Sequence, residues 1–213
     1  MHHTVIMGHS IISHLIQHIH NTDDHRLSPD FRLKNTCSVE MLGSGGLTVH
    51  SLLHDSQILQ MLWNNLEHQP EVILLQVGGN DFRLGTTPED LALEMLGLAA
   101  LLKGRFRVKL IMFMHLLPRF TGTRVGKKWA LSTKEAADYN RWTEQVVRQQ
   151  SEAFEGIPYI STWNHHDYFS FGSCRRHLFD TDGIHLSNQG HFKLYKSLRG
   201  ALMVAGKKLQ GKG

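Results

Sequence analysis

The chain of 213 residues contains only two cysteines and no long apolar run, and both scarcities narrow its class. Cys37 and Cys174 lack the C-x-x-C spacing of a redox or zinc motif, so free thiols are expected, although one disulfide between them stays open. No apolar stretch approaches the roughly 20 residues that a membrane helix needs. No basic start and apolar stretch precede the first expected strand, so the sequence predicts no secretory signal and an intracellular, cytoplasmic protein, whether whole or part of a longer chain.

Lysine and arginine together slightly outnumber aspartate and glutamate, and the formal net charge is +4. Part of the basic excess falls in one Gly-containing segment, and part in a C-terminal tail expected from about residue 205. The residues concerned are Arg119, Arg124, Lys127 and Lys128 in the segment, and Lys207, Lys208 and Lys212 in the tail. A solvated surface is the ordinary interpretation of such charges, and binding of acidic ligands or nucleic acid is the alternative.

Histidine is abundant, with 16 copies scattered along the chain. H-x-x-x-H spacing recurs at His14 with His18 and at His50 with His54. No H-E-x-x-H motif or neighbouring carboxylate cluster accompanies either pair. The sequence therefore predicts solvated helix faces for most of these histidines, and neither a metal nor an organic cofactor.

Short apolar runs alternate with segments of helical spacing along the whole chain. The runs expected to form strands are residues 5–7, 38–41, 72–77, 108–114 and 158–160. The segments expected to form helices are residues 11–20, 49–66, 88–103, 134–154 and 188–204. This alternation predicts an α/β protein with a parallel sheet covered by helices on both faces, as one domain over residues 1–213.

The first expected strand ends at Gly8 and is followed at once by His9 and Ser10. A serine hydroxyl is a weak nucleophile unless a base takes its proton. At a strand-to-helix junction, the hydroxyl of Ser10 can be exposed while its backbone N–H faces an incoming carbonyl oxygen. The alternative is that Ser10 merely caps the helix, as serine very often does.

Three further segments offer polar groups near expected strand ends. Gly45 or Gly46 could present a bare N–H to a ligand, although a simple turn explains them equally well. Asn80 follows two glycines and could donate its side-chain N–H to an oxyanion or form an Asx turn. Asp182 lies three residues before His185, so the carboxylate can meet the imidazole across one turn and stabilise its protonated form.

Taken in order, these four segments resemble the four blocks of the SGNH (GDSL) hydrolases. The blocks are Gly-x-Ser near the start, a glycine block, Gly-Gly-Asn-Asp, and a late Asp-x-x-His, and the resemblance runs from residue 5 to about 198. The chain is most similar to the platelet-activating-factor acetylhydrolase type, including Leu-Leu-Pro-Arg at residues 116–119. Similar SGNH domains also occur in open reading frames of LINE-type retrotransposons.

The resemblance implies a flavodoxin-like three-layer α/β/α fold with five parallel strands in the order 2-1-3-4-5. It also implies a catalytic triad in which Ser10 is the nucleophile, His185 the general base and Asp182 its orienting carboxylate. The implied oxyanion hole combines the backbone N–H groups of Ser10 and Gly46, with Gly45 as the alternate, and the side chain of Asn80.

Two positions depart from the family pattern. His9 stands where the first block usually has aspartate, and Leu47 replaces a polar residue often seen after the second-block glycine. The usual aspartate supports the site without acting as the base, so its replacement bears on efficiency more than on reaction type.

The sequence is best interpreted as a serine esterase that hydrolyses short-acyl or acetyl esters through an acyl-enzyme, with a small-molecule ester or lipid-like substrate. An alternative is a retroelement-associated domain that binds nucleic acid or anionic ligands and keeps residual esterase activity. A third interpretation, a phosphoryl-transfer enzyme, lacks a metal-carboxylate cluster or a G-x-x-x-x-G-K-[ST] loop to support it.

Overall fold

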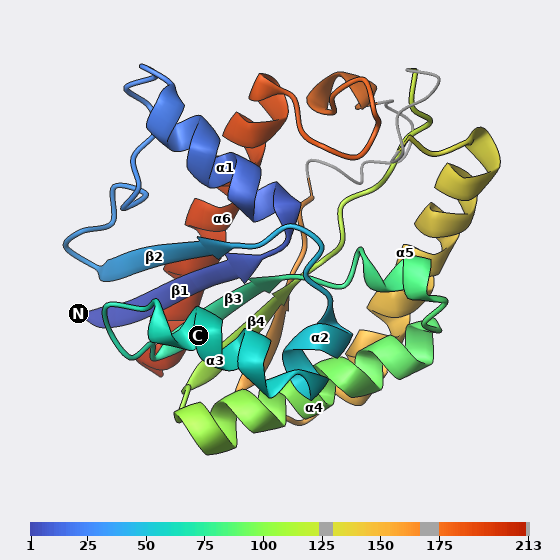
Figure 1. Cartoon of the computed structure of the whole chain (residues 1–213). Coiled ribbons are helices and arrows are strands. Elements are labelled where there is room, and N and C mark those ends of the chain that lie inside the picture. Colours follow the sequence, from blue (N-terminus) through green and yellow to red (C-terminus); the bar gives the residue numbers. More distant parts are fainter. Residues whose placement is uncertain (124–129, 167–174, 212–213) are drawn as a thin grey trace.

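Five parallel strands form the centre of the molecule (Figure 1). The structure is a computed structural model that describes residues 1–123, 130–166 and 175–211. The strand order is β2-β1-β3-β4-β5, which confirms the order expected from the family resemblance. The strands are β1 (His2–Gly8), β2 (Cys37–Gly43), β3 (Val72–Gln76), β4 (Leu110–Met114) and β5 (Ile160–Trp163).

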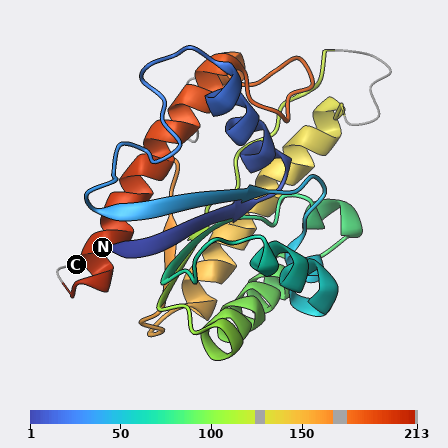
Figure 2. The same ribbon diagram turned by 60° about the vertical axis from the view of Figure 1, so that its left-hand side comes forward.

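Helices cover both faces of this sheet, as the alternating pattern predicts (Figures 1 and 2). On one face lie α1 (Ser10–Asn21) and α6 (Asn188–Leu209). On the other lie α2 (Val49–His54), α3 (Ser56–Asn64), α4 (Pro88–Phe106) and α5 (Thr133–Ala153). Two 3-10 turns, η1 (Asp81–Leu84) and η2 (Arg176–Leu178), complete the elements. In the described part of the chain, no helix has both the length and the apolar character of a membrane span.

The central strand β3 is buried along its whole length, which explains its nearly continuous apolar sequence. Alternate side chains of a strand point to opposite faces of the sheet. Ile73 and Leu75 accordingly join the core beneath α2 to α5, whereas Val72 and Leu74 join the core beneath α1 and α6. The sheet therefore separates two apolar cores.

Most element boundaries shift by a few residues, and three larger differences from the sequence prediction have a physical cause. Residues 49–66 form two helices instead of one, because the Asp55 carboxylate accepts the N–H groups of Gln57 and Ile58 and starts a new helix there. The last strand is β5 at Ile160–Trp163 instead of residues 158–160. This strand lies at an edge of the sheet and carries polar residues, so its sequence has no clear apolar run.

The third difference concerns the expected basic tail. Helix α6 continues to Leu209, so Lys207 and Lys208 lie in its last turn, where positive charge is favourable. Lys212 lies outside the described residues.

The strand ends bring the N-terminal motif and the glycine block to one edge of the sheet. Gly8 of β1 pairs with Gly43 of β2, and both strands end there. Helix α1 starts directly after β1 and passes close to Gly43, where a methyl group would lie 2.3 Å from the backbone nitrogen of Ser13. The glycine thus allows α1 to approach the sheet and sets the position of Ser10.

A buried polar network holds the end of β3. His165 Nε2 lies 2.9 Å from Gln76 Oε1, and His165 Nδ1 lies 2.8 Å from the Ser197 hydroxyl of α6. The Ser197 hydroxyl also accepts a hydrogen bond from the indole N–H of Trp163. Because Gln76 is the last residue of β3, this network fixes the point from which the Gly-Gly-Asn segment leaves the sheet.

Because three histidines are buried, we expect the fold to lose stability in mild acid. Burial lowers the pKa of His9 and His165 to about 3 and that of His191 to about 4, all below the ordinary 6.5. The unfolded chain therefore binds more protons, and stability that is present above pH 6.5 is lost as the pH falls toward these values. Between pH 7.5 and 5, each histidine should cost about 2 kcal/mol of unfolding free energy. Urea unfolding at the two pH values measures this loss, and constant stability would contradict the buried neutral state.

Candidate active site

Ser10, His185 and Asp182 form a continuous hydrogen-bonded line across the carboxyl edge of the sheet. His185 Nε2 lies 3.2 Å from the Ser10 hydroxyl, and His185 Nδ1 lies 2.6 Å from Asp182 Oδ2. Ser10 comes from the start of α1, whereas the other two residues come from the loop between η2 and α6. The structure therefore brings together the three residues that the sequence identified as a possible triad.

The loop around Asp182 holds the carboxylate in one orientation. Its Oδ1 atom accepts hydrogen bonds of 2.9 Å from the backbone N–H groups of Ile184 and His185, which leaves Oδ2 for the imidazole. Burial alone would raise the pKa of Asp182, but the hydrogen bonds from His185 and the two backbone groups outweigh it and lower the pKa well below the usual range. Asp182 is therefore ionised at neutral pH.

Helix α1 also supports the imidazole of His185 from the side. The ring of His14 lies against that of His185, with their centroids 4.7 Å apart. Burial, and then the neighbouring His185, lower the pKa of His14, while Asp182 acts in the opposite direction. His14 thus adds a packing surface to His185, a role that its H-x-x-x-H spacing with His18 does not indicate.

Potential oxyanion donors lie beside the serine. A cavity of about 410 Å³ is lined by Ser10, Gly45, Gly46, Asn80, Arg83, Arg119, Ile184 and His185. Within the described part of the chain, the backbone N–H groups of Ser10, Gly45 and Gly46 make no hydrogen bond. Gly46 has a φ of 78°, a conformation that glycine adopts without strain. All the residues expected to form an oxyanion hole therefore line one cavity.

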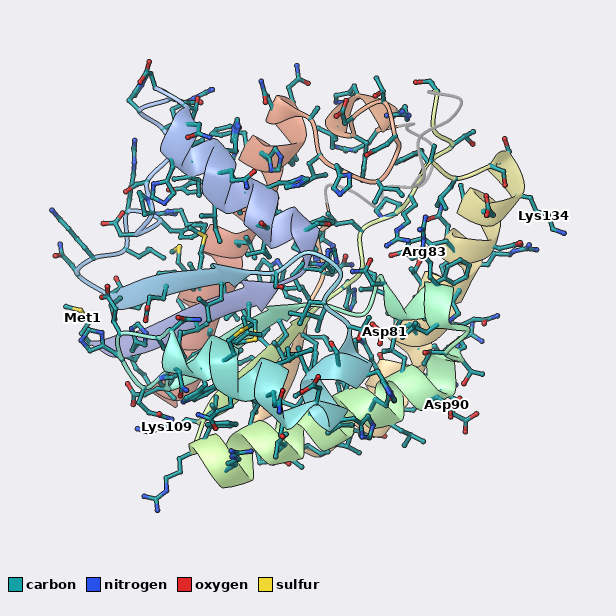
Figure 3. The ribbon with its side chains drawn as sticks, in the orientation of Figure 1. Met1, Asp81, Arg83, Asp90, Lys109 and Lys134 are labelled. Carbon is teal, nitrogen blue, oxygen red and sulfur yellow. The ribbon has the colours of Figure 1, made fainter. Side chains whose placement is uncertain are left out.

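The Gly-Gly-Asn-Asp segment positions Asn80 through two connections. Asn80 Nδ2 donates to the Leu47 carbonyl at 3.2 Å, which leaves its second N–H available. The next residue, Asp81, is fully buried and accepts the N–H groups of Val49 and His50 at the start of α2 (Figure 3). The segment is thereby tied to the glycine block.

His9 is buried, and within the described residues it makes no hydrogen bond with the Ser10 hydroxyl. Its Nδ1 accepts the Ile11 N–H at 3.4 Å, so His9 caps α1. Its Nε2 lies near Gly79, where a methyl group would be 3.5 Å from it. Burial first, and then the charges of Arg119 and His185, lower its pKa to about 3. His9 therefore stays neutral at physiological pH.

Arginine side chains make the cavity basic, and sequence spacing alone does not show this. Arg119 is only 5% exposed, and its Nη2 donates to the Gly79 carbonyl at 2.8 Å. Its guanidinium also stacks on Tyr139, with 4.2 Å between the guanidinium carbon and the ring centroid. Arg83 lies at the exposed rim (Figure 3). Burial, and then the charge of Arg119, lower the pKa of Arg83, partly offset by Glu135.

Several residues that the sequence singled out lie elsewhere. Arg124, Lys127 and Lys128, three of the four residues in the expected basic segment, lie outside the described residues. Cys174 lies outside them too, and Cys37 is a buried free thiol.

Two histidine clusters away from the cavity have the composition of metal ligands. His50 and His54 of α2 meet Glu94 of α4, a carboxylate 40 residues after His54 in sequence. His3, Glu40 and His68 form the second group at the sheet. Neither group includes a residue that lines the serine cavity.

Comparison with known proteins supports a hydrolase fold. The model of the GDSL-like lipase/acylhydrolase family matches residues 6–192. A GDSL-like lipase from Bacteroides thetaiotaomicron shares 16% identity over 95% of this chain and 88% of its own, with a TM-score of 0.64. The lipase/acylhydrolase from Enterococcus faecalis shares 11% identity over 95% of each chain, with a TM-score of 0.59.

An acetyl xylan esterase is similar in fold as well, with 17% identity over 93% of this chain and 98% of its own and a TM-score of 0.59. No curated protein sequence matches the chain. At these identities the solved structures show a common fold.

Proposed function

The chain belongs to the GDSL-like lipase/acylhydrolase family, and from this membership and the site geometry we propose that it hydrolyses carboxylic esters through an acyl-enzyme on Ser10. One observation carries the proposal. The Ser10 hydroxyl, His185 and an ionised Asp182 form one hydrogen-bonded line at the wall of a cavity that also exposes unbonded backbone N–H groups.

In the proposed reaction, Ser10 Oγ attacks the ester carbonyl carbon while its proton passes to His185 Nε2. The tetrahedral intermediate collapses, the alcohol leaves with that proton, and the acyl group stays on Ser10. Water then loses a proton to His185 and attacks the acyl-enzyme, which releases the carboxylic acid and regenerates the serine. Asp182 keeps Nδ1 protonated and stabilises the imidazolium in both steps.

The negative charge that develops on the carbonyl oxygen needs fixed donors. We assign this role to the N–H groups of Ser10 and Gly46, with Gly45 as the alternate, and to the second N–H of Asn80. Donors held in place before the reaction stabilise the transition state without reorganisation at the moment of reaction. The bond from Asn80 to the Leu47 carbonyl supports such preorganisation.

The size of the cavity bears on the acyl group. Its volume of about 410 Å³ lies near the lower end of small-molecule sites, which run from about 300 to 1,000 Å³. Short-acyl or acetyl esters therefore fit the proposed site better than long-chain lipids.

If Ser10 carries the acyl group, Ser10→Ala should lose ester hydrolysis by a factor on the order of 10⁴ or more, because triad members act as a unit. The melting temperature should stay close to that of the wild type. Turnover of para-nitrophenyl acetate measures the loss, with Ser151→Ala on the exposed side of α5 as the matched control. A fluorophosphonate label mapped to a different serine would contradict the assignment.

If Asn80 donates to the oxyanion, Asn80→Ala should lower kcat by about 10²–10³ and leave KM nearly unchanged. Asn80→Asp, which keeps the shape but replaces the donor with an acceptor, should do the same. Asn65→Ala, which removes an exposed amide that donates to the α3 carbonyl of Met61, is the control. Steady-state kinetics measure kcat and KM for each variant. An effect mainly on KM would make Asn80 a residue that binds substrate and not an oxyanion donor.

If His185 is the base, His185→Ala should lose turnover by a factor on the order of 10⁴ or more. His9→Asp should keep or raise turnover of neutral esters, because an aspartate can still cap α1 and, in the described residues, the Ser10 hydroxyl is bonded to His185 and not to His9. Side-by-side kcat values for folded variants test the assignment. An inactive His9→Asp together with an active His185→Ala would make His9 the base.

A further inference from the structure

The cavity beside Ser10 is lined by two arginines and, among the described residues, by no carboxylate. We infer that the preferred ester carries an anionic group, a carboxylate or phosphate, that binds Arg119 with Arg83 at the rim. This inference rests on the proposed esterase function and names its substrate class.

Arg119 is held in place before any ligand binds. Its backbone N–H donates to Asn140 Oδ1 at 2.9 Å, and its carbonyl accepts the Asn140 side-chain N–H at 2.8 Å. The guanidinium is fixed by the Gly79 carbonyl and by the ring of Tyr139. A guanidinium has five N–H donors, so these contacts leave donors for a ligand in the cavity that Arg119 lines.

The charge of Arg119 has no carboxylate at ion-pair distance in the described part of the chain. The two buried carboxylates of this region already accept hydrogen bonds from other groups. Asp81 accepts them from backbone N–H groups at the start of α2, and Asp182 accepts them from the His185 ring and from the backbone of its own loop. A buried charge without a counter-charge is costly, and removing water from the site increases that cost. An anion on the substrate would supply the missing charge.

His9 keeps this charge uncompensated. A methyl group on Gly79 would lie 3.0 Å from the Tyr139 hydroxyl, 3.2 Å from Arg119 Nη2 and 3.5 Å from His9 Nε2, so the three side-chain tips converge there. A neutral imidazole occupies this place. An aspartate at position 9 is shorter, so its carboxylate would stop short of Nε2, but its negative charge would still lie near enough to Arg119 to offset part of the positive charge of the cavity. The replacement of the usual first-block aspartate thus bears directly on the charge of the cavity.

Arg83 adds a second positive charge to the cavity, and it lies close enough to Arg119 for the charge of Arg119 to lower its pKa. Two guanidinium groups around one cavity repel each other, and an anion between them relieves that repulsion. Planar guanidinium groups bind carboxylate and phosphate oxygens through paired hydrogen bonds. Because Ser10 and both arginines line one cavity, the anion and the reacting ester should belong to one molecule.

Matched ester pairs test this preference and show which half of the substrate bears the charge. For the acyl side, mono-para-nitrophenyl adipate is compared with its methyl-capped diester by nitrophenol release. For the alcohol side, para-acetoxybenzoate is compared with its methyl ester by chromatography of the phenol. The wild type should show kcat/KM about tenfold higher for the anionic member of at least one pair. The ratio should fall as salt is added.

Single substitutions identify the residues that cause the preference for the anionic ester. His9→Asp places a negative charge near Arg119 and should bring the anionic-to-neutral ratio of kcat/KM closer to one. Arg83→Gln should lower the ratio severalfold. Arg148→Gln, on the exposed side of α5 and absent from the cavity lining, is the matched control and should keep the wild-type ratio.

A binding measurement separates this inference from the proposed function. Calorimetric titration of Ser10→Ala with each ester pair needs no turnover, and the anionic member should bind about tenfold more tightly. Binding preference without wild-type hydrolysis would support the anion site and overturn the esterase. Hydrolysis of both members at equal kcat/KM, or equal binding of both, would overturn the anion site. A ratio unaffected by His9→Asp would also overturn it.

Discussion

The hydrogen bonding of β1 between β2 and β3 is the constraint on which the site depends. Both pairings are parallel, so the three strands must end at the same edge of the sheet. That edge receives the serine turn after β1, the glycine block after β2 and the Gly-Gly-Asn segment after β3. The sheet therefore assembles three segments that are spread over residues 8 to 80, and the loop before α6 adds the histidine and the aspartate.

The fold and the triad could be predicted from sequence because their signals are local and repeated. The nearly continuous apolar sequence of β3 identifies it as a strand buried on both faces, and the structure agrees. The Asp-x-x-His spacing is short enough that one turn joins Asp182 and His185, whatever the rest of the chain does. The helix break at Asp55 and the polar edge strand β5 were missed because hydrophobic periodicity does not register a side-chain cap or an edge position.

The electrostatic character of the cavity could not be predicted in the same way, because it depends on contacts between distant segments. In sequence, Arg119 is one member of a basic segment, for which a solvated surface is the ordinary interpretation and a loop that borders the site and binds anionic ligands or nucleic acid is the alternative. In the structure it is buried between Gly79 and Tyr139, which lie 40 residues before it and 20 after it. The same holds for Glu94, which reaches His50 and His54 only because α4 packs against α2.

The replacement of aspartate by histidine at position 9 affects both a local feature, the cap of α1, and a contact between distant segments, the surroundings of Arg119. As a local cap of α1, either side chain can accept the Ile11 N–H, so the start of the helix and the position of Ser10 are compatible with both residues. The difference lies in the charge near Arg119, because an aspartate would offset part of that charge and a neutral imidazole does not. Burial lowers the pKa of His9 to about 3, which rules out a second positive charge there at neutral pH and leaves the arginines as the source of the field. Position 9 is therefore expected to act through the charge of the cavity, because His9 is not part of the hydrogen-bonded line from Ser10 to Asp182.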